Sequence, residues 1–241
     1  VDTCVYASHR FTPDEVMEIR YASLLHDFGK VGVREQVLVK AKKLDHNTLE
    51  LVLQRLRQRE LERALNLLAN AWKGGQHFQP EFWENAIRKE RDDTDRLIQL
   101  VTRSNEPTVL SQEIAEGLGF LGELEVEHWS GDRVPIVEQR HLTSLNIRRG
   151  SLSPEERLEI ESHVTHTFRF LRLIPWTKDL SGVPEIAYAH HERLSGTGYP
   201  RQLKEEEIPT QSKAMAIADV FDALTARDRP YKTAVPLEKS L

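Results

Sequence analysis

Two long helical stretches restrict the fold of this chain more than any other feature. Between residues 46 and 72, apolar residues recur every three or four positions, which places them on one side of an α-helix. A second stretch of the same kind, about 80–103, follows the glycine pair Gly74-Gly75, which breaks the first. No pair of alternating segments indicates a β-hairpin. The sequence therefore predicts an all-α fold that contains an antiparallel helical hairpin.

Further helices are predicted on both sides of this hairpin. Thr12-Pro13 and Ser153-Pro154 each place an N-cap residue before a proline, with a glutamate at the third helical position. The first of these helices is expected to stop near Gly29, because glycine favours helix ends. A last helix is expected at about 210–227. Residues 104–150 contain several glycines and prolines, and they predict at most a short helix.

Composition excludes several classes of protein. With 39% hydrophobic and 29% charged residues, the chain can bury an ordinary globular core. A net charge of −5 gives no general attraction to nucleic acid or anionic membranes, so we expect no nucleic-acid polymer as partner. No apolar run approaches the ~20 residues of a membrane span. The single cysteine excludes an internal disulfide and fits a reducing compartment, so we expect a cytoplasmic protein.

Six imidazole and carboxylate side chains fall at the ends or on the apolar faces of the predicted helices. They are His26, Asp27, His163, His190, His191 and Asp219. Each alone has an ordinary explanation, such as a hydrogen-bonded core histidine or a polar helix end. Together they form a nitrogen and oxygen ligand set without thiolates, which suits Fe, Mn, Zn or Mg. Six ligands are too many for one catalytic ion with an open position, so two ions are expected.

Basic side chains stand close to these positions in the sequence. Lys30 follows the His-Asp pair by one helical turn, and Arg193 follows the His-His pair. Arg229 and Lys232 close the last helix, where a solvated basic turn is the ordinary alternative because the helix dipole favours it. Paired ions polarise a phosphodiester and generate hydroxide near neutral pH. Metal-assisted hydrolysis of a phosphodiester is therefore the chemistry that these residues indicate.

Taken in chain order, these motifs resemble the HD-GYP family, a branch of the HD metal-dependent phosphohydrolases. The resemblance covers about 11–44 and 147–232. It is carried by His26-Asp27-Phe28-Gly29-Lys30, the capped helix with His163, His190-His191-Glu192-Arg193 with Gly198-Tyr199-Pro200, and Ile217 to Leu224 with Arg229-Pro230-Tyr231-Lys232. It implies an HD-type helical bundle formed by residues 1–44 and 147–241. Residues 45–146 would then be an inserted helical subdomain.

The resemblance also implies an activity and a role for each matching residue. The family's enzymes hydrolyse cyclic di-GMP, a bacterial signalling dinucleotide, to linear pGpG or GMP. By this match the six residues above hold two or three divalent ions, iron or else manganese, with Asp27 and a hydroxide bridging them. Lys30 and Asp222 are implied as catalytic residues beside the scissile phosphate. The implied substrate contacts are Arg193, Tyr199, Arg229 and Lys232.

Three departures from the family pattern keep a second interpretation open. The family's further metal-binding segment would precede residue 11, and the chain begins too late to contain it. Ser195 stands where the family usually has aspartate, and residues 45–146 replace a short connection. The alternative is a catalytically weak scaffold that binds cyclic di-GMP or a partner protein. An HD enzyme acting on another nucleotide is a third interpretation, which the Gly-Tyr-Pro motif disfavours.

The sequence also raises expectations about partners. It opens at Val1 without a methionine, so we expect a piece of a longer protein with an upstream sensory domain and signalling partners. The helical pattern of 46–103 leaves open a hairpin that projects from the body, a dimerising coiled coil, or a segment packed on a missing neighbour. A homodimer through the insertion is therefore one expectation.

Overall fold

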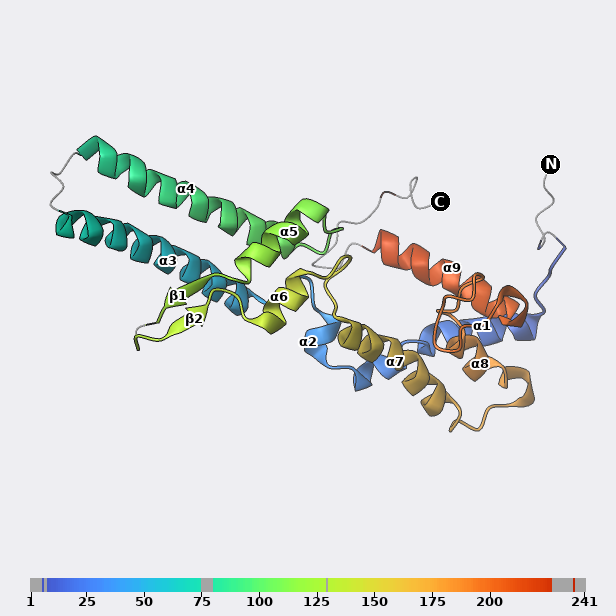
Figure 1. The fold of residues 1–241 in the computed structure, drawn as a ribbon. Coiled ribbons are helices and arrows are strands. Elements are labelled where there is room, and N and C mark those ends of the chain that lie inside the picture. Colours follow the sequence, from blue (N-terminus) through green and yellow to red (C-terminus); the bar gives the residue numbers. More distant parts are fainter. Residues whose placement is uncertain (1–5, 7, 75–79, 129, 227–235, 237–241) are drawn as a thin grey trace, which may run out of the picture. The chain divides into compact units, whose positions relative to one another are not determined.

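A computed structural model describes residues 6, 8–74, 80–128, 130–226 and 236 of the chain. The chain divides into two compact units, Val1–Val39 with Pro154–Leu241 and Lys40–Ser153 (Figure 1). We call the first the histidine unit and the second the hairpin unit. The interpretation of 45–146 as an insertion in a catalytic domain stays a prediction. No helix in the described part of the chain is long and apolar enough to cross a membrane.

The histidine unit contains helices and no β-strand among its described residues. Its elements are α1 (Pro13–Leu25), η1 (Phe28–Gly32), α2 (Glu35–Leu38), α7 (Pro154–Leu171), η2 (Lys178–Leu180), α8 (Val183–Tyr188), η3 (Glu205–Glu207) and α9 (Thr210–Thr225). The predicted capping box of α1 is confirmed, because Thr12 and Glu15 satisfy each other's backbone N–H groups. However, α1 ends at Leu25, four residues before the predicted stop at Gly29.

A small apolar core joins the helices of the histidine unit. It consists of Ala22, Leu171, Val183, Ile186, Ala187 and Met215, which come from α1, α7, α8 and α9. α8 packs against both α1 and α7, and η1 packs against α7. This packing brings the end of α1 and the end of α8 toward the same side chains of α7. The ends of α1 and α8 therefore meet the middle of α7 in this unit.

The hairpin unit consists of two long helices and a smaller base. Its elements are α3 (His46–Lys73), α4 (Pro80–Ser104), α5 (Gln112–Leu121), β1 (Glu125–Glu127), β2 (Arg133–Pro135) and α6 (Gln139–Leu145). α3 and α4 lie side by side and antiparallel, as predicted (Figure 1). An ion pair between Arg57 and Asp95, 2.7 Å apart, joins them.

The expectation of no β-hairpin is wrong, although the all-α class is confirmed. β1 and β2 pair antiparallel, with Val126 opposite Val134. Each strand has only three residues. Such a length is too short for alternation of polar and apolar residues to become visible in a sequence.

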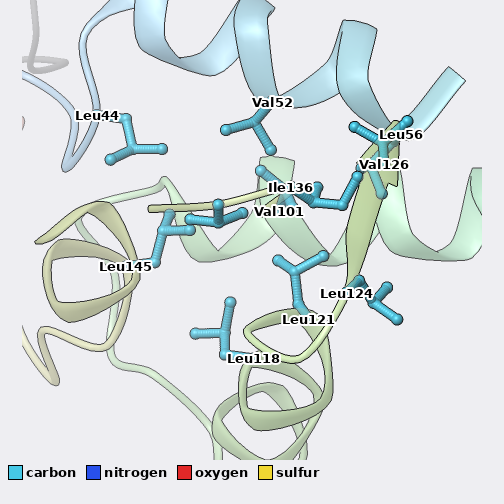
Figure 2. Close-up of a cluster of buried hydrophobic side chains, with 11 residues drawn as sticks. Leu44, Val52, Leu56, Val101, Leu118, Leu121, Leu124, Val126, Ile136 and Leu145 are labelled. Atoms are coloured by element: carbon cyan, nitrogen blue, oxygen red, sulfur yellow. The ribbon is translucent and has the colours of Figure 1, made fainter. Parts of the chain in front are cut away.

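The hairpin unit has an apolar core of its own at its base. Figure 2 shows side chains from α3, α4, α5, β1 and α6 filling the space between these elements. Val101, Leu118, Leu121, Ile136 and Leu145 are completely buried. A core of this kind can hold a unit together independently of the rest of the chain.

The two ends of the hairpin unit lie next to each other. Near the boundary, the Ser151 hydroxyl donates a hydrogen bond to the carbonyl oxygen of Lys40 at 2.8 Å. Further in, the buried Lys43 ammonium donates to the carbonyl oxygen of Leu145 at 3.0 Å. The chain therefore enters and leaves this unit at nearly the same place.

Candidate metal centre

The histidine unit brings the six predicted metal ligands together. His163 lies within α7 and Asp219 within α9, as predicted. The other four lie in turns rather than in helices. His26 and Asp27 follow α1 directly, and His190 and His191 follow α8. A turn at a helix end lets neighbouring side chains point the same way, which consecutive positions inside a helix do not allow.

Asp27 stands at the centre of this group. One of its carboxylate oxygens, Oδ1, lies 3.3 Å from His163 Nε2. The other, Oδ2, lies 3.3 Å from His26 Nε2 and 2.6 Å from the Lys30 ammonium. Asp219 approaches the same side, with Oδ1 at 3.6 Å from His26 Nε2. The two oxygens of one carboxylate therefore face two different histidines.

Three histidines of the site share one orientation. In His26, His163 and His190, Nδ1 contacts the backbone carbonyl oxygen three residues earlier. Nδ1 therefore donates its proton to that carbonyl, and Nε2 is the ring atom that is left to bind a ligand. In the described part of the chain, these three Nε2 atoms are buried without a hydrogen-bond partner. Buried polar atoms are rarely left unpaired, so they point to a ligand.

Two sets of ligand atoms lie close enough to hold an ion. His163, His190 and His191 form one set, and His26, Asp27 and His190 form the other, with ligand atoms within 4.8 Å of one another in each set. His190 belongs to both. The residues present thus fit metal binding, with nitrogen and oxygen donors and no thiolate.

Burial and neighbouring charges shift the pKa values of these residues in different directions. Burial lowers the pKa of His190 to about 4 and that of His191 to about 3, so both rings are neutral at pH 7. Burial alone would raise the pKa of Asp27, but His163, His26 and Lys30 together bring it far below the usual range. Burial lowers the pKa of His26, and Asp219 and Asp27 raise it more, to about 10, so a bound ion would have to displace the proton from His26 Nε2.

The structure shows fewer contacts between the remaining predicted site residues and the six candidate metal ligands. The Tyr199 ring lies beside the His191 ring, with centroids 4.8 Å apart, and burial raises the pKa of Tyr199, so its hydroxyl stays protonated. Arg193 and Asp222 are exposed. Ser195, the departure from the family motif, shares a hydrogen bond of 2.8 Å with Thr197. Two predicted substrate contacts, Arg229 and Lys232, lie outside the described residues.

Thr167 was missed by the sequence interpretation. This buried residue, one turn after His163, receives the Gly29 N–H at 2.9 Å and donates to the His26 carbonyl oxygen at 2.8 Å. It therefore fixes the turn that carries Asp27 against α7. A threonine on the buried face of a helix, four residues after a candidate ligand, was the available signal.

Glu192 was also missed, although it lies in the His-His-Glu motif. It is buried, and its two carboxylate oxygens accept the backbone N–H groups of Arg201 at 2.7 Å and Leu203 at 2.9 Å. A carboxylate used in this way holds a loop in shape rather than binding a metal. It therefore anchors the Gly-Tyr-Pro loop next to the histidine pair.

Comparison with known proteins agrees with this site. Residues 140–241 match the family model described as an HD domain. Over 94 residues, the chain is 46% identical to a cyclic di-GMP phosphodiesterase of Thermotoga maritima, covering 39% of this chain and 25% of that protein. Over 92 residues, it is 39% identical to 3'3'-cGAMP-specific phosphodiesterase 3 of Vibrio cholerae, covering 38% and 19%. Over 131 residues, it is 35% identical to 3'3'-cGAMP-specific phosphodiesterase 1 of that organism, covering 54% and 30%.

The match identifies residues 140–241 as similar to an HD domain, and the ligand sets of the site fit the metal dependence of that family. More narrowly, the motifs of the chain resemble the HD-GYP type of that family, and its similarity to phosphodiesterases of cyclic dinucleotides agrees with this resemblance. The chain spans less than a third of the length of the three relatives described above. The family model begins at residue 140, so the placing of His26 and Asp27 in the site comes from the structure.

Proposed function

We propose that this protein hydrolyses a cyclic dinucleotide, with cyclic di-GMP as the first candidate, at a metal centre in the histidine unit. The observation that carries the proposal is the set of buried Nε2 atoms of His26, His163 and His190. They surround a carboxylate that is held ionised, and neutral imidazoles with an ionised carboxylate are the ligands that iron or manganese needs. The similarity to phosphodiesterases of cyclic dinucleotides supports the choice of substrate.

Five of the six proposed ligands fall into two groups that share His190, and Asp219 approaches the second group at His26. Two ions, or three with further ligands, would be held by His26, Asp27, His163, His190, His191 and Asp219. Asp27 is suited to bridge, because its two oxygens face different histidines. Such ions, iron or else manganese, supply an activated water and neutralise charge on the phosphate.

The other residues of the site would act on the substrate itself. Lys30, whose ammonium lies 2.6 Å from Asp27, can place positive charge beside the scissile phosphate. Tyr199 keeps its proton and can donate a hydrogen bond while its ring faces a base. We assign Asp222 to the catalytic group beside the phosphate. The proposed phosphate contacts are Arg193, Arg229 and Lys232.

The test is metal analysis and nucleotide chromatography on the protein extended upstream of Val1. We expect bound iron or manganese and conversion of cyclic di-GMP to pGpG or GMP, with 3'3'-cGAMP as the competing substrate. Asp27→Ala should lose metal and lower turnover by at least about 10³-fold, since it removes a ligand of both ions. Asp179→Ala removes an exposed acid of η2 and serves as the control. Bound metal without turnover would rule out the proposed phosphodiesterase activity.

A scaffold that binds cyclic di-GMP without hydrolysing it is the second candidate. Ser195 favours it, because the serine bonds to Thr197 at a position where the family usually has a carboxylate. Calorimetry with cyclic di-GMP distinguishes the two: binding without product supports the scaffold. Gain of turnover in Ser195→Asp would show that the missing carboxylate is responsible.

We also propose a cytoplasmic signalling role, with an upstream sensory domain and a homodimer formed through the hairpin unit. Leu61, Leu65 and Trp72 lie at heptad spacing on α3 and are 64%, 65% and 88% exposed. Such a stripe is typical of a coiled-coil contact. Light scattering should give a dimer mass for the chain and a monomer mass for Leu65→Glu. A monomer mass for both would exclude this contact.

A further inference from the structure

A cavity of about 540 Å³ lies within the hairpin unit, between α3, the second half of α4 and α5. This volume is typical of a small-molecule site. All the residues that line it lie between positions 59 and 120, so it shares none with the metal centre. Its lining is unusual for a helical hairpin, because four arginines and three acidic residues meet apolar side chains there.

Two of the arginines are neutralised within the cavity. The Arg63 guanidinium donates to the Glu90 carboxylate at 2.9 Å, and Glu90 is almost completely buried. Arg96 pairs with Asp93 in the same helix at 3.1 Å. These two pairs contribute no net charge, so the charge available to a ligand comes from the remaining side chains.

Arg59, Arg103 and Glu113 are those remaining charges. Their side chains have no hydrogen bond or ion pair with any residue that the structure describes. Together they leave one net positive charge in the cavity. Arg59 is half-buried. Burial is the main cause that lowers the pKa of its guanidinium, and the positive charge of the neighbouring Arg63 lowers it further. A partly desolvated guanidinium of this kind is stabilised when a carboxylate pairs with it.

Part of the cavity lining is apolar. Leu97 and Leu100 from α4 face Ile114 and Phe120 from α5. Gly117 allows the two helices this approach, because a Cβ atom there would lie only 3.0 Å from both δ-carbons of Leu100. The cavity thus offers one cationic group and one hydrophobic wall to the same ligand.

We propose that this cavity binds a small organic monoanion, with its carboxylate against Arg59 and its apolar body against Leu100 and Phe120. The single net positive charge balances the charge of one carboxylate, whereas a dianionic phosphate would leave one negative charge unbalanced in the cavity. The planar guanidinium also fits a carboxylate with two parallel hydrogen bonds. The hairpin unit is therefore a ligand-binding unit.

Titration calorimetry of the whole chain with 4-phenylbutyrate tests the proposal. Wild type should bind this acid, and 4-phenylbutan-1-ol, which has the same body without the charge, should bind about tenfold more weakly. Arg59→Gln should weaken binding of the acid about tenfold or more. Arg88→Gln removes an exposed arginine of α4 outside the cavity and should bind as wild type does. No binding by wild type, or equal binding by the two variants, would overturn the proposal.

A second pair of variants tests the apolar wall. Phe120→Glu should abolish binding, because it removes the wall and places a negative charge beside the carboxylate. Phe82→Glu is the matched control, since Phe82 is 56% exposed, Phe120 is 57% exposed, and Phe82 does not line the cavity. Circular dichroism shows whether each variant folds. Retention of binding by a folded Phe120→Glu would overturn the assignment of the ligand to this cavity.

Discussion

Replacing Gly29 with alanine would test how the turn that carries Asp27 is held against α7. A Cβ atom at this position would lie 2.0 Å from the carbonyl oxygen of His163 and 2.6 Å from the backbone nitrogen of Thr167. Ordinary contacts begin at 3.4 Å, so the turn or the helix must move by about 1.4 Å. Both opposing atoms belong to the backbone of α7, which cannot rotate away as a side chain can.

The expected loss in free energy of unfolding follows from this overlap. Overpacking of a core costs about 1–3 kcal/mol, and a clash with helix backbone belongs at the upper end. For a chain of this size, about 3 kcal/mol lowers the unfolding temperature by roughly 6–12 °C. The same movement would change the distance of 3.3 Å between Asp27 Oδ1 and His163 Nε2. Metal ligands tolerate shifts of only about 0.2 Å, so metal affinity should fall at least about tenfold.

The measurements are thermal unfolding by circular dichroism and metal content after dialysis. Gly119→Ala is the matched control, because Gly119 lies inside α5 and a Cβ there meets nothing within 4 Å. That control should leave the metal content unchanged and stabilise the protein by about 0.5–1 kcal/mol. If Gly29→Ala unfolds and binds metal as Gly119→Ala does, the close contact with α7 is not what holds the turn.

Three further predictions follow from single contacts. Glu192→Gln leaves the buried N–H of Arg201 or Leu203 without an acceptor and should cost about 1–3 kcal/mol in urea unfolding; an unchanged midpoint would contradict this. Arg34 lowers the pKa of Glu159 from 4.5 to about 2, so this pair stabilises the folded state above pH 4.5. The difference in unfolding temperature between wild type and Glu159→Gln should be present at pH 7, shrink below pH 4.5 and vanish near pH 2; a constant difference would exclude the pair as its cause. A chelator should lower the unfolding temperature of metal-loaded protein, because the ions bind the folded state; equal temperatures would argue against the metal centre.

The sequence predicted helices well where local signals are strong. Two such local signals are the capping box of Thr12 and Glu15 and the apolar period of 46–72. The helices that they predict begin at the expected residues. Gly29 shows the limit of such signals. The sequence analysis interpreted Gly29 as a helix stop, but α1 ends earlier, at Leu25. Gly29 is needed because the turn there contacts Thr167 of α7, which lies 138 residues further along the sequence. A contact over that separation leaves no trace in a local pattern.

The candidate site was predictable in its residue types but not in its supports. Histidines and aspartates in apolar surroundings stand out in a sequence because they are costly to bury. Thr167 and Glu192 do not, since a buried threonine or a loop-capping glutamate looks ordinary without the backbone groups it bonds. The two short strands were missed for a similar reason, because their pairing depends on neighbours rather than on alternation.

The neighbouring ends of the hairpin unit have a consequence for the order in which the metal centre can form. Docking Gly29 onto Thr167 closes a loop of 138 residues in an unfolded chain. Once Ser151 is bonded to Lys40, the loop that remains is only roughly 25–30 residues long, which lowers the entropy cost of closure by about 1.4 kcal/mol. A folded hairpin unit thus favours assembly of the metal centre through chain connectivity alone. Substitutions that loosen its base would therefore weaken metal binding without altering any ligand.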